Sequence, residues 1–333
     1  MYKKQKPYEG QLQKLDLRDR DAFSCACYLP EIGNTPAKGD ILAWSESSAV
    51  AFANSVLGAR SNRNSGGIDF LCNVLQKAPE FDLLTDTGRQ AKWLVDVQTS
   101  SLPNPQLLGS AIGLKVVEAV PFIAGLDRFL NDGLNDEEKD YFKEMGAASA
   151  SNGAVGLYHA DNLTPEAVEL GRDLLVADYQ TYVIDDAEIA RVKASYPNIW
   201  ADKQATPKKA FVGCPHLSAK QLLTWTDNLE AALKVAGQEK VKVDTYFVAP
   251  PAVAAAFKKD ADRYQRLVKS GVRLTSICPL MYMMNPMSGK RPVVTNSNKL
   301  RTYSSARFFE DAELLRILAT GTIQQIKEES NHA

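Results

Sequence analysis

The chain has 333 residues, 45% apolar and 24% charged, and its 39 basic and 40 acidic side chains give a net charge of −1. This length indicates about two domains, which bury enough surface to fold without disulfides or a structural metal. The composition excludes collagen-like, disordered and disulfide-scaffold proteins, and the balanced charge does not support nucleic-acid binding.

The first twenty residues are polar, which is not typical of a secretory signal, and the sequence contains no apolar run of membrane-spanning length. We therefore expect a cytoplasmic protein without a membrane partner. Its five cysteines are an odd number spread along the chain, and we expect them to be reduced thiols available for metal binding or catalysis.

Short apolar runs alternate with amphipathic stretches along the chain, a pattern that predicts an α/β fold. We expect doubly wound, largely parallel sheets with flanking helices. Residues 21–28 read as a strand running into a loop, and helices are expected over 41–57 and 68–77. Further strands are predicted in the middle of the chain, at 93–97, 116–123, 154–158 and 181–184.

The clearest β-α-β-α-β pattern lies between residues 208 and 278. Strands are predicted at 209–213, 241–248 and 272–277. Ser218 and Gln221 form a predicted capping box for the first helix, which Gly237 ends. A polar connector at 201–207 suggests a division into one domain over 1–200 and another over 201–333.

Two cysteines follow predicted strands of this run, and each precedes a proline. Cys214 and Cys278 therefore lie at the sheet edge where open α/β proteins bind ligands. Cys214 also precedes a helix N-terminus, where the helix dipole favours the thiolate. Both residues have an equally plausible interpretation as buried structural thiols. Three thiolates from distant loops would leave an open position on an iron centre, as a Lewis-acid catalyst requires.

Other polar residues have both a structural and a functional interpretation. His216 is either a hydrogen-bonded histidine near a helix start or a residue that contacts substrate or orients a metal ligand. Arg60 and Arg63 form a solvated turn or bind a carboxylate or phosphate bidentately. Residues 295–299 form an Asn/Ser turn or an anion site at a strand end. Glycine-rich nucleotide loops and the HExxH and GxSxG motifs are absent from the sequence.

Four segments in order resemble a known family. Residues 43–63, AWSESSAVAFANSVLGARSNR, closely resemble the signature of the large subunit of aconitase X, a dehydratase branch of the aconitase superfamily. Shorter matches follow at GCPHLS (213–218), SICP (276–279) and TNSNK (295–299). The long first motif is highly specific, and the order of the others reinforces it.

The resemblance implies an iron-dependent hydro-lyase. It implies that Cys25, Cys214 and Cys278 hold iron, as a two-iron two-sulfur cluster or a mononuclear ion. It places His216 and Ser47 as catalytic residues, and it assigns substrate binding to Arg60, Asn62, Arg63, Ser297 and Lys299. The implied substrate is a hydroxy acid: we expect cis-3-hydroxy-L-proline, with mevalonate 5-phosphate as the alternative.

The resemblance also implies a partner. The general base of the superfamily is a serine on a small swivelling domain, and no glycine-rich serine motif matches it here, so we expect a separate small subunit that carries this serine. Relatives have more chain upstream of the first cysteine motif, which motivates a second hypothesis, a non-catalytic paralogue or regulatory partner that keeps the fold. A third, a thiol redox protein using Cys25 and Cys27, lacks the CxxC spacing.

Overall fold

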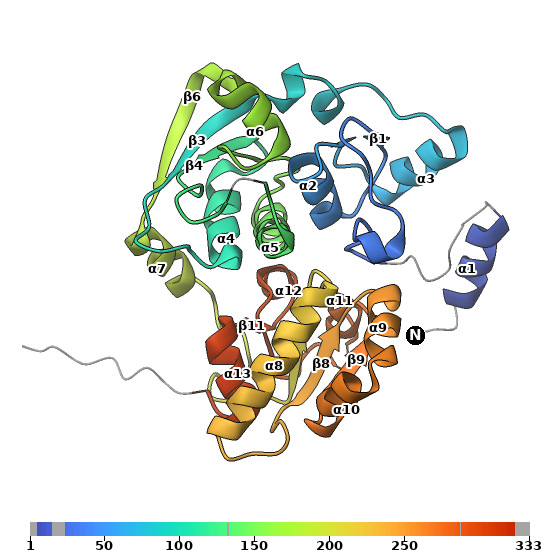
Figure 1. Ribbon diagram of the computed structural model, residues 1–333, viewed down its shortest axis with the longest axis vertical. Coiled ribbons are helices and arrows are strands. Elements are labelled where there is room, and N and C mark those ends of the chain that lie inside the picture. Colours follow the sequence, from blue (N-terminus) through green and yellow to red (C-terminus); the bar gives the residue numbers. More distant parts are fainter. Residues whose placement is uncertain (1–4, 15–23, 132, 287, 324–333) are drawn as a thin grey trace, which may run out of the picture.

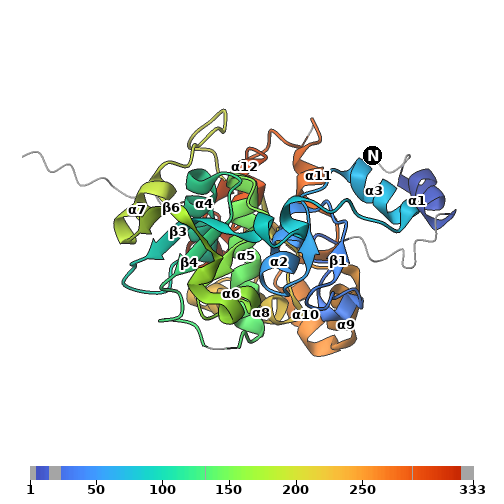
Figure 2. The ribbon, with the colours of Figure 1, turned by 90° about the horizontal axis from the view of Figure 1, so that it is seen from above.

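The computed structural model describes residues 5–14, 24–131, 133–286 and 288–323. Within them the chain forms three sheets, and every strand pairs with its neighbours in parallel. Figure 1 shows the four-stranded sheet beside the region of α2 and α3, with the five-stranded sheet and its helices below both. The view from above, in Figure 2, shows α5 next to α2. The predicted α/β class with parallel sheets and flanking helices is confirmed.

The N-terminal region contains a two-stranded sheet and short helices. Its strands are β1 (Ile41–Leu42) and β2 (Arg60–Ser61). Its helices are α1 (Gln5–Lys14), α2 (Ser47–Ser55) and α3 (Gly66–Leu75), with 3-10 helices η1 (Pro30–Ile32), η2 (Asp82–Leu84) and η3 (Thr87–Arg89). Helix α2 starts later than predicted because Glu46 takes the N-cap position, where its side chain accepts from Ala49 N.

The middle region is built on a four-stranded sheet. Its strand order is β5 (His159–Ala160), β4 (Pro121–Ala124), β3 (Ala91–Val97) and β6 (Leu175–Ile184). Its helices are α4 (Pro105–Val116), α5 (Asp136–Asn152), α6 (Pro165–Leu170), the 3-10 helix η4 (Gly171–Leu174) and α7 (Asp186–Ala194). Helices α4 and α5 approach closely, since a Cβ on Gly109 would lie 2.2 Å from the carbonyl oxygen of Met145.

The C-terminal region is built on the five-stranded sheet. Its strand order is β11 (Arg307–Phe308), β10 (Val293–Thr295), β7 (Lys209–Val212), β8 (Asp244–Val248) and β9 (Arg273–Thr275). Its helices are α8 (Ala219–Val235), α9 (Pro251–Lys259), α10 (Ala261–Lys269), α11 (Pro279–Met283), α12 (Asn298–Thr302) and α13 (Asp311–Thr320). Because the strands are parallel, the loops after β7, β9 and β10 leave the same edge of the sheet.

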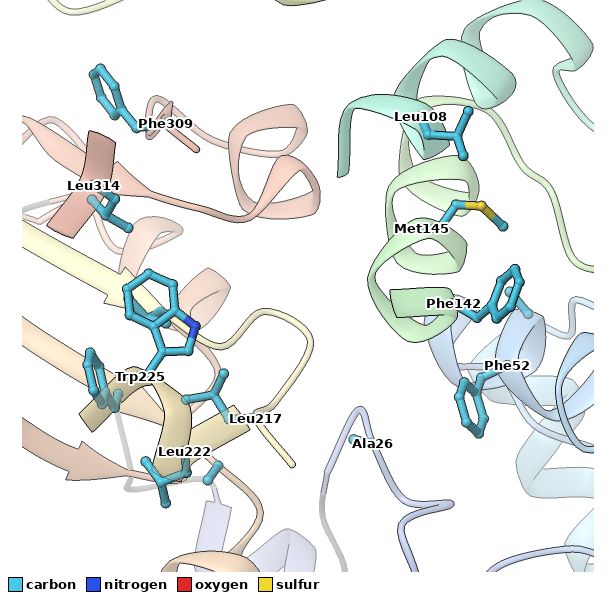
Figure 3. Packing of buried hydrophobic residues seen from close by; sticks show 14 of the residues in the cluster. Ala26, Phe52, Leu108, Phe142, Met145, Leu217, Leu222, Trp225, Phe309 and Leu314 are labelled. Atoms are coloured by element: carbon cyan, nitrogen blue, oxygen red, sulfur yellow. The ribbon is translucent and has the colours of Figure 1, made fainter. Parts of the chain in front are cut away.

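One apolar core joins these regions. Figure 3 shows Leu108, Phe142, Met145 and Phe52 on one side and Leu217, Leu222, Trp225, Phe309 and Leu314 on the other. All are buried members of a single cluster that reaches both large sheets. The three regions therefore pack against one another through buried apolar side chains, and this packing holds the loops that lie between them. None of the described helices is both long and apolar enough to cross a bilayer.

Several predicted elements differ from those observed. Of the predicted strand at 21–28, residues 21–23 lie outside the described residues, and 24–28 form turns. Residues 154–158 precede β5 instead of forming a strand, because side chains bind their backbone: Tyr158 N donates to Ser55 Oγ at 2.9 Å. The segment between β8 and β9 forms two helices, α9 and α10, which are divided at Asp260, whose side chain caps α10.

The capping box of Ser218 and Gln221 is confirmed. The predicted division at 201–207 falls in the segment between α7 and β7, and the two-domain organisation stays a prediction.

Candidate functional site

The loop after β7 is held against β8 by a glycine. Gly213 has φ of +105°, and a Cβ there would lie 2.3 Å from the carbonyl oxygen of Val248. Only glycine tolerates both the positive φ and this approach. The loop continues through the cis peptide Cys214-Pro215 and ends where Ser218 caps α8. Cys214 therefore lies at the carboxyl edge of the sheet, where its side chain is buried (6% exposed).

The three predicted metal cysteines come from three segments. Cys214 acts electrostatically on Cys25, and Cys278 acts on Cys214. Cys25 is in the turn before η1, and its sulfur accepts from the backbone N–H of His216 at 3.2 Å. Burial raises the pKa of the Cys25 thiol well above its usual value, and the negative charges of Glu46 and Cys214 raise it further. Cys278 occupies the N-cap position of α11.

The same influences act on Cys214. Burial raises the pKa of Cys214 to about 12, with Cys278 adding to the effect and Lys299 opposing it. The thiols of Cys25 and Cys214 are therefore protonated when no metal is bound, and binding a metal through them would release protons.

The donor set fits an iron centre by its chemistry. Cysteine sulfurs are the ligands that iron–sulfur centres use, and Cys214 interacts electrostatically with both Cys25 and Cys278. In the same region, the imidazole Nε2 of His216 is a buried polar atom for which the described part of the chain offers no hydrogen-bond partner. In the part of the chain that is described, the sulfurs do not form a ready group of three metal ligands at binding distance. The residues therefore match the group in type, while the structure shows no coordination geometry.

A buried ion pair joins the C-terminal region to the start of α2. Lys299 Nζ donates to the carboxylate of Glu46 and lies 3.3 Å from the hydroxyls of Ser47 and Ser48. Burial alone would lower the pKa of Lys299, but Glu46 and the thiols of Cys214 and Cys25 outweigh it and raise that pKa. Burial likewise opposes ionisation of Glu46, yet Lys299 lowers the pKa of that carboxyl. The pair is therefore charged, and the ammonium faces the thiols.

Glu46 was missed by the sequence analysis. Its position inside the specific segment 43–63, directly beside Ser47, was the available signal. Its partner is 253 residues away, and a separation of that kind leaves no trace in local periodicity.

His216 is 3% exposed and is held from several sides. Its carbonyl accepts from Lys143 Nζ at 3.2 Å, and its Nδ1 lies 3.0 Å from Ser24 Oγ. Burial and the nearby charge of Lys143 lower the pKa of His216 to about 4, so the ring is neutral near pH 7. A buried polar group left without a partner costs about 1–3 kcal/mol, which makes the unpaired Nε2 a notable feature of the site.

Ser297 connects β10 to the cysteine loop. Its hydroxyl donates to the carbonyl oxygen of Cys214 and caps α12 by accepting from Leu300 N at 3.0 Å. Ser297 is 1% exposed. These contacts fix the backbone on both sides of the thiol, and the predicted role of Ser297 in substrate binding stays a prediction.

Arg60, Asn62 and Arg63 follow α2 and bond to the region around η2. Asn62 bridges two backbone groups, donating to Phe81 O at 3.0 Å and accepting from Leu83 N at 2.9 Å. Arg60 binds Asp86 at 2.5 Å, and Arg63 donates to Ala154 O at 2.5 Å. Their recorded partners are therefore structural groups and none is a cysteine of the site, so a role for them in substrate binding also stays a prediction.

A second polar cluster lies behind Cys214. A small pocket there is lined by Gln106, Glu144, Gly213, Cys214, Pro215, Leu217 and Asn296. Burial raises the pKa of Glu144 to about 8, and the carboxylate of Asp311 adds to the shift. Gln221 Nε2 donates to Glu144 Oε1 at 2.6 Å. The sequence analysis treated Gln221 only as a capping residue and did not single out Glu144.

The fold and the site define a parallel α/β protein with two cysteines, Cys214 and Cys278, after the carboxyl ends of its strands and a third, Cys25, close to Cys214. Family models covering most of the chain match the descriptions Aconitase X first domain (residues 1–87), second domain (91–194) and third domain (208–318). The chain therefore belongs to the aconitase X family.

Named relatives support this assignment. The chain is 31% identical over 275 residues to the phosphomevalonate dehydratase large subunit of Thermococcus kodakarensis, covering 81% of this chain and 64% of that protein. It is 33% identical over 159 residues to the cis-3-hydroxy-L-proline dehydratase of Pseudomonas aeruginosa, covering 47% of this chain and 26% of that protein. The chain thus spans less than two thirds of the length of these relatives.

A solved structure is similar as well. The crystal structure of Thermococcus kodakaraensis aconitase X in its holo form matches with a TM-score of 0.74 and 27% identity. The match covers 93% of this chain and 76% of that one.

Proposed function

We propose that this chain is the large subunit of an iron-dependent hydro-lyase that removes water from a hydroxy acid. The observation that supports the proposal is electrostatic proximity: Cys214 acts on Cys25, Cys278 acts on Cys214, and the buried Lys299 feels both Cys214 and Cys25. Cys25, Cys214 and Cys278 would hold the iron, as a two-iron two-sulfur cluster or a mononuclear ion. Bound iron would supply Lewis acidity, which lowers the cost of expelling hydroxide.

The other residues of the site would position the substrate. The Lys299 ammonium lies beside Ser47 and faces the thiols, where it would hold a carboxylate or the departing oxygen. His216 would contact the substrate from the Cys214 loop. The proton on the adjacent carbon needs a base, and we propose that a serine of a separate small subunit supplies it, in line with relatives named as large subunits.

We propose cis-3-hydroxy-L-proline as the substrate, on the basis of charge. Two lysines of this region are each paired with a carboxylate: Lys299, which acts on the thiols, with Glu46, and Lys143, which binds the carbonyl of His216, with Asp140. Such a site has little excess positive charge, which suits a zwitterionic amino acid better than a phosphate ester. We also propose that the protein works in the cytoplasm.

The second candidate substrate is mevalonate 5-phosphate. It is favoured by the comparisons, since the relatives that match over more of this chain are named phosphomevalonate dehydratase large subunits. A phosphate ester would need a cation released from its present partner, and Arg60 is the accessible choice because Asp86 is 89% exposed.

Two other functions are less well supported. A thiol redox role for Cys25 and Cys27 conflicts with burial, which raises the pKa of Cys27 to about 12 and keeps the thiol protonated. A non-catalytic paralogue would have no need for a charged Lys299–Glu46 pair beside three thiols, although it would keep the fold.

The test is anaerobic co-expression with an aconitase X small subunit, followed by iron analysis and dehydration assays on both substrates. We expect bound iron and turnover of cis-3-hydroxy-L-proline. Turnover of mevalonate 5-phosphate alone would reverse the choice of substrate. Absence of iron from the pure complex would overturn the proposed function.

A further inference from the structure

The imidazole of His216 has one bonded nitrogen and one unbonded nitrogen, and both are buried. Nδ1 lies 3.0 Å from Ser24 Oγ, whereas Nε2 has no hydrogen-bond partner among the described residues. The backbone of the same residue is fixed, since its N–H donates to Cys25 Sγ at 3.2 Å and its carbonyl accepts from Lys143. The ring therefore has a defined orientation, and the position of its proton decides what Nε2 can do.

The hydrogen-bond requirements of Ser24 decide where that proton lies. Ser24 Oγ accepts from Ala26 N at 3.0 Å, which uses one lone pair and leaves the hydroxyl hydrogen to donate. Within the described residues the remaining neighbour of this hydroxyl is His216 Nδ1, which must then be the unprotonated acceptor. The opposite arrangement would leave two groups unmet, the Ser24 hydroxyl hydrogen and the Nε2 lone pair, instead of one.

We propose that Ser24 is a positioning residue that holds His216 as the tautomer with its proton on Nε2, so that His216 donates a hydrogen bond to an oxygen of the substrate. This inference rests on the proposed function for the identity of the acceptor and on the hydrogen-bond geometry alone for the tautomer. Ser24 and His216 are 192 residues apart and meet only in the folded chain.

The tautomer restricts the role of His216. A nitrogen that carries a proton cannot ligate a metal and cannot act as a general base. His216 is therefore neither a fourth metal ligand through Nε2 nor the group that removes the substrate proton. Its remaining role is to donate a hydrogen bond in a site closed to water, where such a bond is strong.

Nitrogen-15 spectroscopy of histidine-labelled chain tests the tautomer directly. His159 is a natural reference, because its Nε2 lies 2.8 Å from the carbonyl oxygen of Arg89 and must donate. Variants His159→Gln and His216→Gln assign the signals. We expect wild-type His216 to show a protonated Nε2 and an unprotonated Nδ1, as His159 does. A protonated Nδ1 in the wild type would overturn the proposal.

Three serine variants separate positioning from a structural role. Ser24→Ala should shift His216 toward a mixture of tautomers, and Ser24→Thr, which keeps the hydroxyl, should restore the wild-type spectrum. Ser195→Ala is the matched control, because Ser195 bonds Val192 O at 2.7 Å in a different region. An unchanged His216 spectrum in Ser24→Ala would also overturn the proposal, whether or not the complex is active.

Kinetics of the complex with the small subunit test the acceptor. Loss of a partner that orients a histidine typically lowers activity 10- to 100-fold. We expect a loss of about tenfold or more in kcat/KM for Ser24→Ala and full activity for Ser24→Thr. Normal kinetics together with an altered tautomer would show that the substrate is not the acceptor. If the complex has no dehydratase activity at all, the proposed function fails while the spectra still decide the tautomer.

Discussion

Two polar regions of this molecule were both predicted from the sequence to belong to the site, yet they differ in their bonding. The loop of Arg60, Asn62 and Arg63 has its recorded hydrogen bonds and ion pairs with structural groups around η2 and α5. The cluster around Cys214 contains a buried charged lysine, the protonated thiols of Cys25 and Cys214 and an imidazole nitrogen without a hydrogen-bond partner among the described residues. The first region has its bonding needs met within the protein, and the second has needs that a bound group would meet. Polar groups that lack a partner within the protein therefore indicate a binding site better than residue type does.

The largest expected effect is on the thiols. Cys214→Ser replaces a soft sulfur ligand by a hydroxyl, and in the complex with a small subunit we expect loss of most bound iron and a fall in turnover on the order of 100-fold. Iron per chain and dehydration rate are the measurements. Cys72→Ser is the matched control, since Cys72 is a buried thiol on α3. If Cys214→Ser bound as much iron as the wild type, the cluster around Cys214 would not be the iron site, and its contrast with the arginine loop would not mark a binding site.

The buried ion pair should be the next most sensitive feature. Lys299→Met leaves the Glu46 carboxylate unpaired, which for a fully buried pair costs about 3–5 kcal/mol. Because the Glu46 side chain is 34% exposed, we expect about 3 kcal/mol in the free energy of unfolding by urea. The double variant Lys299→Met/Glu46→Gln should recover more than half of the loss. Equal stability of the single and double variants would show that the two charges are not coupled.

In the arginine loop, we expect the loss of hydrogen bonds to lower the free energy of unfolding more than the loss of a charge. Asn62→Ala strands the buried N–H of Leu83 and the carbonyl of Phe81, for an expected loss of about 2 kcal/mol in urea unfolding. Arg60→Ala breaks an ion pair with an exposed partner and should cost less than about 1 kcal/mol. The reverse order of these two losses would mean that the loop depends on its guanidinium charge.

The last expected effect, smaller than that of Asn62→Ala and dependent on pH, belongs to the Glu144 carboxyl behind Cys214. Burial and Asp311 raise the pKa of Glu144 to about 8, so the folded chain keeps a proton that the unfolded chain releases near pH 4.5. Stability falls as the pH rises between these values, and Glu144→Gln removes this fall. We expect the variant to match the wild type near pH 4 and to gain about 1–2 kcal/mol at pH 8, measured by urea unfolding. A difference that does not change with pH would contradict this explanation.

Part of this arrangement was predictable from the sequence, because it depends on residues that are close together along the chain. Strand β7, the capping box of Ser218 and the positions of Cys214 and Cys278 after strands follow from short patterns of apolar, capping and turn residues. Such patterns encode backbone geometry within a few residues of each other. That Cys214 and Cys278 lie at the same edge of the sheet then follows from the parallel arrangement of the strands.

The remainder depends on contacts between distant segments. Glu46 meets Lys299 across 253 residues, and Ser24 meets His216 across 192. Nothing in the neighbourhood of either residue encodes its partner, because the docking of whole regions brings them together. The arginine loop also depends on distant contacts. The local sequence around Arg60 and Arg63 did not indicate that their guanidinium groups bind the backbone carbonyls of Leu84 and Ala154.

The Lys299–Glu46 contact has a consequence for how the site comes into being. Residues 24–47 and residues 214–299 belong to opposite ends of the chain, and neither contains both halves of the pair. A nascent chain that has emerged only as far as β6 therefore carries one thiol turn and an uncompensated carboxylate. The thiols, the ammonium and the imidazole come together only when the five-stranded sheet docks, so the metal that we propose they hold would bind after the fold is complete.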